Sequence, residues 1–146
     1  MYYKLIGFIV AFSFCLFVDL RFSFCQDDVE KASRQATLRG SITPDRQWWD
    51  LKHYHLSVAL DPKTKSLSGS NVVSFTAIES GKKLQIDLQE PLEIKKITHE
   101  NVELKFDREG NAHWIHFSTE IKKGSTHKIV IQYGGTPVES KNPPWS

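Results

Sequence analysis

The stretch spanning residues 48–77 constrains the fold of this chain more than any other, because it predicts two strands joined by a turn. Its first half alternates apolar with polar or small side chains, the period of a half-buried strand, and the apolar positions are Tyr54, Leu56, Val58 and Leu60. Its second half keeps this period, with one face formed by Leu67, Gly69, Asn71, Val73, Phe75 and Ala77. Between the halves, Pro62 presets φ for a turn and Asp61 can hydrogen-bond the turn backbone. The stretch therefore predicts a β-hairpin with a longer loop.

The sequence after this hairpin predicts more short strands. Leu84, Ile86 and Leu88 alternate with polar residues, and the Glu90-Pro91 pair ends this third strand. Later strands are marked by apolar positions near residues 92–97, 104–106, 115–117 and 129–133, with turns between them. A phase slip at Lys95-Lys96 predicts a bulge. Strands of this kind are typical of an all-β fold, either an antiparallel sandwich or a saddle-like open sheet.

The first 25 residues are typical of a signal peptide. Lys4 provides a positive start, an apolar run covers residues 5–18, and small residues stand just before Gln26. A membrane anchor is the alternative, but Asp19 ends the apolar run well short of the ~20 residues that a spanning helix needs. We therefore expect cleavage before Gln26 and export to the periplasm or outside the cell, with no membrane attachment afterwards.

Both cysteines, Cys15 and Cys25, lie in this leader. A phenylalanine precedes each one, where a lipoprotein signal has a small residue, so we do not expect lipid attachment. The exported chain would then contain no disulfide and no thiol, which excludes a cysteine nucleophile and a cysteine-based zinc cluster. The net charge is +2 and the basic residues are scattered in pairs, so no nucleic-acid partner is expected.

Two regions follow the leader. Residues 26–47 are polar and mixed, and we expect them to form a linker or arm that contains at most a short helix over residues 29–38. Residues 48–146 are expected to form one β-domain that is held together by packing alone.

Histidines are the main candidates for chemistry. His53 and His55 have the spacing that places two imidazoles on one face of a strand, as zinc sites on sheets require. A catalytic zinc needs a third protein ligand, and the other histidines are spread over several predicted strands without a motif: His99, His113, His116 and His127. The motif His-Glu-x-x-His is missing from the sequence. We therefore predict no catalytic, cofactor-binding or metal-binding residue in this chain, with His53 and His55 facing solvent.

Other residue types provide no stronger candidate. The sequence contains no Gly-x-Ser-x-Gly elbow, P-loop or dinucleotide fingerprint. Four carboxylates lie in or near predicted turns, where solvation is the default: Glu90, Glu93, Asp107 and Glu109. Exposed tryptophans on a β-sandwich can stack on sugar rings, and the candidates are Trp48, Trp49, Trp114 and Trp145. A pair such as Trp48-Trp49 before an edge strand instead favours packing at the end of the sheet.

Part of the sequence resembles a known family. The residues that carry the resemblance are Leu38-Arg39-Gly40-Ser41, Thr43-Pro44, Arg46, Trp48-Trp49-Asp50, Asp61-Pro62, Leu67-Ser68-Gly69-Ser70-Asn71 and Lys141-Asn142-Pro143-Pro144-Trp145. Together they look like the N-terminal β-domain of zinc aminopeptidases of the aminopeptidase N family. The resemblance implies a complete enzyme that removes N-terminal residues from peptides, with a glutamate activating zinc-bound water.

The resemblance also implies where that chemistry lies. In such enzymes the β-domain packs on the metal-bearing helical domain and forms one wall of the substrate cleft. The zinc ligands and the residues that hold the substrate amine would all lie beyond Ser146. We therefore expect this chain to be inert by itself, without bound zinc, and to have the downstream catalytic domain as its partner.

A free-standing secreted module that binds carbohydrate or protein is the alternative. Such a module should close its sheet and end on a covered strand. This chain instead ends on Asn142-Pro143-Pro144-Trp145-Ser146, which is neither a strand nor a helix cap. We therefore expect a β-domain that is incomplete at its C-terminal end.

Overall fold

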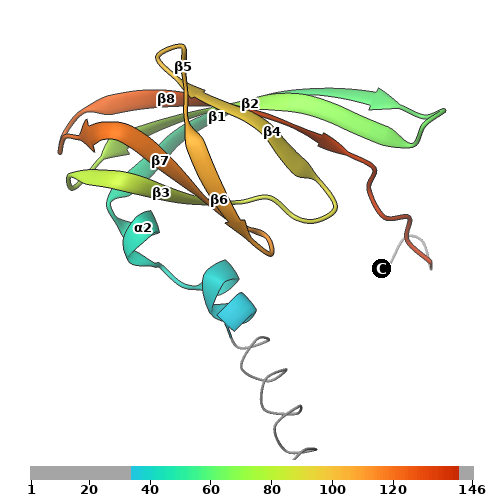
Figure 1. Ribbon diagram of the computed structural model, residues 1–146, viewed down its shortest axis with the longest axis horizontal. Coiled ribbons are helices and arrows are strands. Elements are labelled where there is room, and N and C mark those ends of the chain that lie inside the picture. Colours follow the sequence, from blue (N-terminus) through green and yellow to red (C-terminus); the bar gives the residue numbers. More distant parts are fainter. Residues whose placement is uncertain (1–33, 142–146) are drawn as a thin grey trace, which may run out of the picture. The chain divides into compact units, whose positions relative to one another are not determined.

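The computed structural model describes residues 34–141 (Figure 1). The leader and Trp145 lie outside these residues, and so does the first part of the short helix expected over residues 29–38. The chain divides into two units, residues 1–40 and residues 41–146. In the first unit, residues 34–40 are helical. None of the described helices has the length and apolarity needed to cross a membrane.

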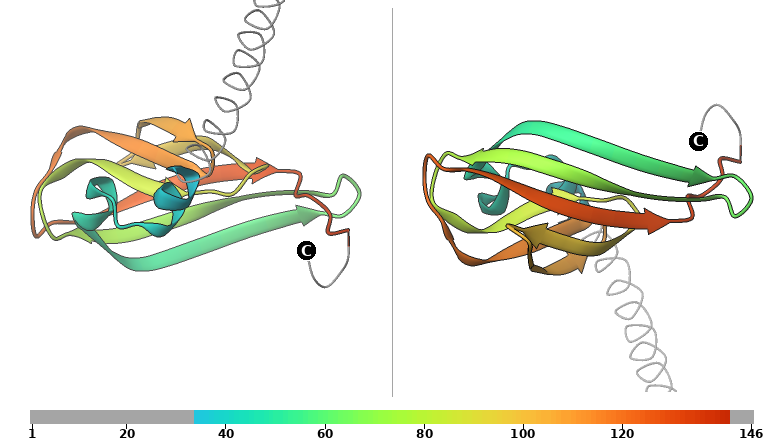
Figure 2. Two further views of the ribbon diagram at one scale, coloured as in Figure 1. Left: turned by 90° about the horizontal axis from the view of Figure 1, so that it is seen from below. Right: turned by 90° about the horizontal axis from the view of Figure 1, so that it is seen from above.

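The second unit consists almost entirely of strands. A short helix, α2 (Pro44–Gln47), precedes eight described strands: β1 (Trp49–Asp61), β2 (Ser66–Ala77), β3 (Gly81–Asp87), β4 (Glu93–His99), β5 (Val102–Glu103), β6 (Lys105–Glu109), β7 (Ala112–Ile121) and β8 (Thr126–Gly135). They form a five-stranded sheet in the order β1-β2-β8-β4-β5 and a three-stranded sheet in the order β3-β7-β6. All paired strands are antiparallel. Figure 2 shows the two sheets as separate layers, so the predicted all-β antiparallel fold is confirmed.

The predicted hairpin is present. Strands β1 and β2 pair from Trp49 opposite Ala77 to Asp61 opposite Ser66, with one register shift in β1 after Leu51. The Asp61 carboxylate accepts a hydrogen bond of 2.9 Å from the backbone N–H of Lys63 in the loop. This contact is the one that the turn chemistry predicts.

Two local irregularities interrupt the regular pairing of the larger sheet, and the first of them is predicted by the sequence. The register of β4 against β8 shifts between Ile94 and Lys96, which is the predicted bulge. Gly69 marks a close backbone approach, because a Cβ atom there would lie 2.2 Å from the carbonyl oxygen of Ser57.

The core lies between the two sheets and is dominated by aliphatic and aromatic side chains. Its large buried side chains include Val73, Phe75, Leu84, Ile97, Ile115, Phe117 and Ile129. Trp48 is 5% exposed and meets Phe75 edge-on, with the ring centroids 6.0 Å apart. Its indole N–H donates a 2.7 Å hydrogen bond to the carbonyl of Lys83, so the polar atom of this buried ring is satisfied. The predicted packing role of the tryptophan pair is therefore confirmed.

One prediction about β1 is wrong. The sequence predicts a half-buried strand, yet Tyr54, Leu56, Val58 and Leu60 are 46%, 59%, 55% and 73% exposed. Strand β1 is the edge of the larger sheet, and the β1–β2 hairpin reaches past the smaller sheet (Figures 1 and 2). Within the described residues, this stripe therefore lacks the second layer that would bury it.

Candidate functional site

An apolar groove of about 580 Å³ opens along the inner side of β1. Most of its wall is aliphatic or aromatic and comes from both sheets: Leu51, Tyr54, Leu56, Val73, Ile86, Leu88, Leu92, Ile94, Ile131 and Tyr133. Its polar wall includes Asn71 and the ion pair between Arg46 and Asp87, whose N and O atoms are 2.5 Å apart. Asn71 Oδ1 is buried without a hydrogen-bond partner among the described residues.

The residues that line this groove are suited to binding rather than to catalysis. Burial raises the pKa of the Tyr54 hydroxyl, and the Asp87 carboxylate raises it further, so this phenol stays protonated at neutral pH. Arg46 and Asp87 neutralise each other instead of providing a base for a nucleophile. A mostly apolar wall with few polar groups suits an apolar ligand or polypeptide segment.

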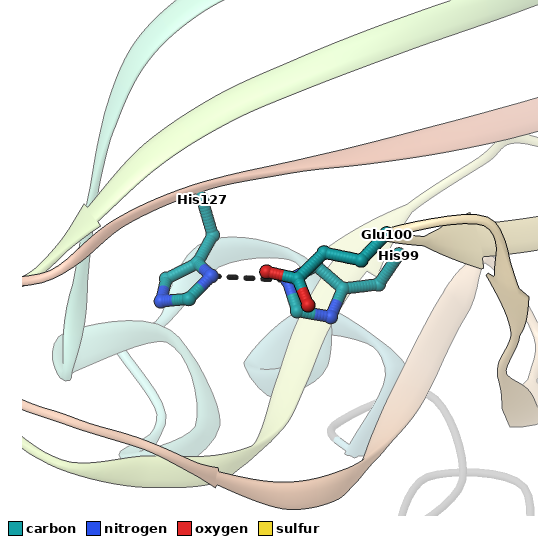
Figure 3. Close-up of side chains that lie close together, drawn as sticks. All are labelled: His99, Glu100 and His127. Carbon is teal, nitrogen blue, oxygen red and sulfur yellow. Dashed lines mark hydrogen bonds and ion pairs between the residues drawn. The ribbon is translucent and has the colours of Figure 1, made fainter.

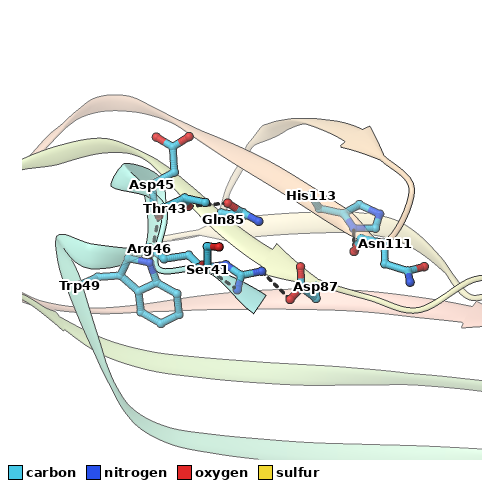
Figure 4. A network of polar contacts seen from close by, with 9 residues as sticks. All are labelled: Ser41, Thr43, Asp45, Arg46, Trp49, Gln85, Asp87, Asn111 and His113. Carbon is cyan, nitrogen blue, oxygen red and sulfur yellow. Dashed lines mark hydrogen bonds and ion pairs between the residues drawn. The ribbon is translucent and has the colours of Figure 1, made fainter. Parts of the chain in front are cut away.

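A polar network fastens α2 to β3 beside this groove (Figure 4). The hydroxyl of Thr43 donates to Gln85 Oε1 over 2.6 Å, which satisfies an amide oxygen of a side chain that is only 1% exposed. Trp49 Nε1 donates to the carbonyl of Asp45 over 3.2 Å. These bonds, with the Arg46–Asp87 pair, hold the residues before β1 against β3.

His113 is a second buried polar group in Figure 4. Its Nδ1 lies 3.2 Å from the carbonyl oxygen of Asn111, which can only accept, so the proton of the neutral ring sits on Nδ1. Burial is the main cause that lowers the pKa of His113, and Arg108 lowers it further, whereas the Asn111 carbonyl and Asp87 raise it. The imidazole is therefore a core group that is held neutral.

The structure brings together two histidines and a carboxylate at the other end of the larger sheet (Figure 3). His99 Nε2 and His127 Nδ1 are 3.0 Å apart, and Glu100 Oε1 is 3.8 Å from His99 Nε2. His99 is 13% exposed and meets Phe117 edge-on at 5.3 Å, whereas the Glu100 side chain is 75% exposed. Burial is the main cause that lowers the pKa of His99; His127 lowers it too, and Glu100 raises it.

Comparisons with known proteins address the fold. No model of a protein family matches the sequence, and no curated protein does. A mutant of the M1 zinc metallopeptidase from Deinococcus radiodurans, bound to a Tyr-Ser-Ala substrate, matches with a TM-score of 0.57 and 20% identity over 68% of this chain. The M1 zinc metallopeptidase from the same organism, and a two-domain M1 mutant bound to L-arginine, each match with a TM-score of 0.56 and 20% identity over 67% of this chain.

This chain has the fold of part of an M1 zinc metallopeptidase. It spans only 23% of the length of each of these three peptidases. The resemblance to the aminopeptidase N family that the sequence carries is thus confirmed as a likeness of fold. Below, residues 41–141 are called the β-domain.

Within the β-domain, the two histidines that the sequence singles out lie apart from the cluster. His53 and His55 face outward on β1, opposite Ser74 and Val72, and both are exposed. The cluster of His99, Glu100 and His127 was missed, because it joins β4 to β8, which are far apart in the sequence. The available signal was weak, since it consisted of one histidine at a strand end and another near a strand start.

Two further tryptophans were candidates for stacking on a ligand. The ring of Trp114 is covered by the Lys83 ammonium, which lies 5.3 Å from the ring centroid. This cation–π contact occupies one face of the indole. Trp145 lies outside the described residues.

Proposed function

We propose that this chain is the N-terminal, non-catalytic β-domain of an exported zinc aminopeptidase that removes N-terminal residues from peptides. The observation that carries the proposal is the match of 68% of this chain to 23% of an M1 zinc metallopeptidase. The run of family-like residues in the sequence supports the same assignment. Zinc and the peptide-binding residues belong to the rest of the parent enzyme in this proposal.

The possible zinc ligands of this chain support the assignment of zinc binding and catalysis to the rest of the parent enzyme. The sequence contains no His-Glu-x-x-His motif, which supplies two zinc ligands and the general base of such peptidases. The histidine cluster does not replace it, because its single carboxylate, Glu100, lies among the possible ligands and leaves no second carboxylate to act as base. We therefore assign no step of peptide hydrolysis to the described residues.

The exposed surface of β1 supports a docking role for the domain. Leu56, Val58 and Leu60 form an apolar stripe on a long edge strand, next to the groove. Exposed apolar patches and open strand edges are characteristic of surfaces that contact another polypeptide. The remainder of the parent peptidase, including its catalytic domain, is the occupant that we propose. The buried Asn71 oxygen would then accept a hydrogen bond from that segment.

Export is part of the proposal and rests on the first 25 residues. Their positive start, apolar run and small residues before Gln26 support secretion or delivery to the periplasm. Cleavage there would leave the domain free of cysteine.

The test isolates the native protein with antibodies raised against residues 41–141. The proposal predicts that they capture from the exported fraction a polypeptide several times larger than this chain, and that the captured material hydrolyses aminoacyl anilides. The purified 146-residue chain should hydrolyse none. Capture of an inactive protein no longer than this chain would refute the proposal in favour of a secreted binding module.

A further inference from the structure

We propose that His99, Glu100 and His127 form a binding site for a divalent transition-metal ion of the zinc class. The three donors are His99 Nε2, His127 Nδ1 and the Glu100 carboxylate, and these atoms lie within 4.8 Å of one another. They come from β4, from the turn that follows it and from β8. The site is a property of this chain alone, so it does not depend on the proposed function.

The sheet register places both imidazoles on one face. His99 pairs with Ile129 across β4 and β8, and His127 precedes Ile129 by two residues. Because side chains alternate along a strand, His127 and Ile129 point to the same side, and the diagonal neighbours His99 and His127 can meet. Both rings lie on the core side, where Phe117 packs against His99 and Phe75 lies next to His127.

The turn after β4 brings the carboxylate to the same place. In a continuing strand, Glu100 would point away from the face that carries His99. Glu100 and Asn101 instead adopt left-handed φ values of 51° and 67°, in the two-residue turn between His99 and Val102. The turn ends the alternation, and the Glu100 carboxylate reaches the His99 ring (Figure 3).

Hydrogen bonds leave His127 Nδ1 free of a proton, so that this nitrogen can bind a metal ion. The Ser125 hydroxyl donates to the carbonyl of Lys122 over 2.5 Å, so its oxygen must accept from His127 Nε2, 2.8 Å away. The proton of a neutral His127 is thereby held on Nε2, and Nδ1 carries a lone pair. Orientation of a ligating imidazole through its other nitrogen is the usual arrangement around metal sites.

Without a metal ion, one hydrogen bond joins the rings of His99 and His127. His99 Nε2 donates it to the lone pair on His127 Nδ1 across 3.0 Å. Binding of a metal ion requires that this proton leave Nε2, either for His99 Nδ1 or for solvent. Both facing nitrogens are then ligands, and each ring remains neutral if the proton moves to Nδ1.

The donor set selects the class of ion. Two imidazoles and a carboxylate suit zinc and its first-row neighbours, whereas calcium and magnesium require oxygen ligands. Tetrahedral zinc with bonds of about 2.0–2.1 Å needs ligand atoms roughly 3.3 Å apart. The two separations that start at His99 Nε2, 3.0 Å to His127 Nδ1 and 3.8 Å to Glu100 Oε1, lie on either side of that value, and all donor atoms lie within 4.8 Å of one another. The 75% exposure of the Glu100 side chain leaves room for water as a fourth ligand.

This inference replaces the sequence-based expectation that the chain binds no metal. That expectation considered spacing along the chain, and His99 and His127 are 28 residues apart. The pairing of β4 with β8 brings these two residues close together in space.

The test is calorimetric titration of the chelator-treated, tag-free full chain with Zn²⁺ at pH 7.5, accompanied by Co²⁺ absorption spectra. We expect one equivalent of Zn²⁺ to bind and Co²⁺ to show a tetrahedral spectrum. His127→Gln should abolish both, and Glu100→Gln should weaken binding while leaving the fold intact, because this side chain is mostly exposed. Ser125→Ala should weaken binding by about 10–100-fold through loss of ligand orientation.

The matched control is the double variant His53→Ala/His55→Ala, which removes the other closely spaced histidine pair and should bind Zn²⁺ like the wild type. Nuclear magnetic resonance of the metal-free chain should show His127 as the Nε2–H tautomer, and Zn²⁺ should shift the resonances of both cluster imidazoles. Absence of stoichiometric binding, unchanged binding in Glu100→Gln and His127→Gln, or loss of binding only in the β1 double variant would each overturn the proposal.

Discussion

Gly81 lies directly against the indole ring of Trp48, so that a Cβ atom at residue 81 would be 2.3 Å from the ring. That distance is far below van der Waals contact, and Trp48 is 5% exposed and meets Phe75 and Phe117 edge-on, so a displacement of its ring would disturb both aromatic contacts. Gly81 at the start of β3 can therefore pack directly against Trp48, the residue before β1, because glycine has no side chain.

The first prediction follows from this contact. Gly81→Ala should displace Trp48 and lower the free energy of unfolding by about 1–3 kcal/mol, the usual cost of overpacking a core. Denaturant unfolding monitored by tryptophan fluorescence measures this change. Gly40→Ala is the matched control, because a Cβ atom there meets nothing within 4 Å, and it should change stability by less than about 0.5 kcal/mol. Equal effects of the two substitutions would contradict the packing argument.

The second prediction concerns the exposed apolar stripe on β1. Val58→Lys/Leu60→Lys should reduce self-association of the purified chain, because both side chains are more than half exposed and charges on an edge strand oppose pairing. Stability should change by no more than about 0.5 kcal/mol, since little buried contact is lost. Sedimentation velocity at several concentrations measures association.

The control for this prediction adds the same charge on the other face. Ser57→Lys/Ala59→Lys places two lysines on the outward side of β1, where both residues are also exposed. If this control suppresses association as strongly as Val58→Lys/Leu60→Lys, net charge rather than the apolar stripe is responsible.

The third prediction is a dependence of stability on pH. The pKa of His113 in the folded state lies below its unfolded value, mainly because the ring is buried. As the pH falls through the unfolded value near 6.5, the unfolded chain binds a proton that the folded chain does not, so stability falls until the folded pKa is reached. His113→Asn can keep a donor near the Asn111 carbonyl without titrating, and it should weaken this dependence between pH 7.5 and pH 5.

Urea unfolding across that pH range provides the measurement. His99, whose pKa is also lowered by burial, remains in the variant, so part of the acid sensitivity should persist. His53→Asn, on the exposed face of β1, is the control for the same substitution at a histidine outside the core. A steeper loss of stability toward acid in His113→Asn would contradict the assigned direction.

The fourth prediction is cleavage between Cys25 and Gln26 during export. The positive start, the apolar run and the small residues before Gln26 motivate it. Intact-mass analysis of exported material should give a chain that begins at Gln26. A mature protein that still contains Cys15 would show that the leader acts as an anchor.

The sequence by itself determined the strands and their turns. The strand predicted around Tyr54 to Leu60, the Asp61-Pro62 turn and the bulge predicted at Lys95-Lys96 are all present in the structure, although the apolar face of that strand is exposed. These features depend on neighbouring residues, because side-chain alternation, a fixed proline φ and a short hydrogen bond are local properties. The family-like residues pointed to the same fold.

Only the tertiary structure decided which strands meet and which faces are covered. Strand β8 lies between β2 and β4, so His127 meets His99 although 28 residues separate them. The smaller sheet covers only part of the larger one, so the apolar side of β1 is exposed although its period is that of a half-buried strand. The order of the strands, and which part of one sheet the other covers, arise from packing between segments that are distant in the sequence. Apolar residues at every second position show which side chains share one face of a strand, but they do not show which segment packs against that face.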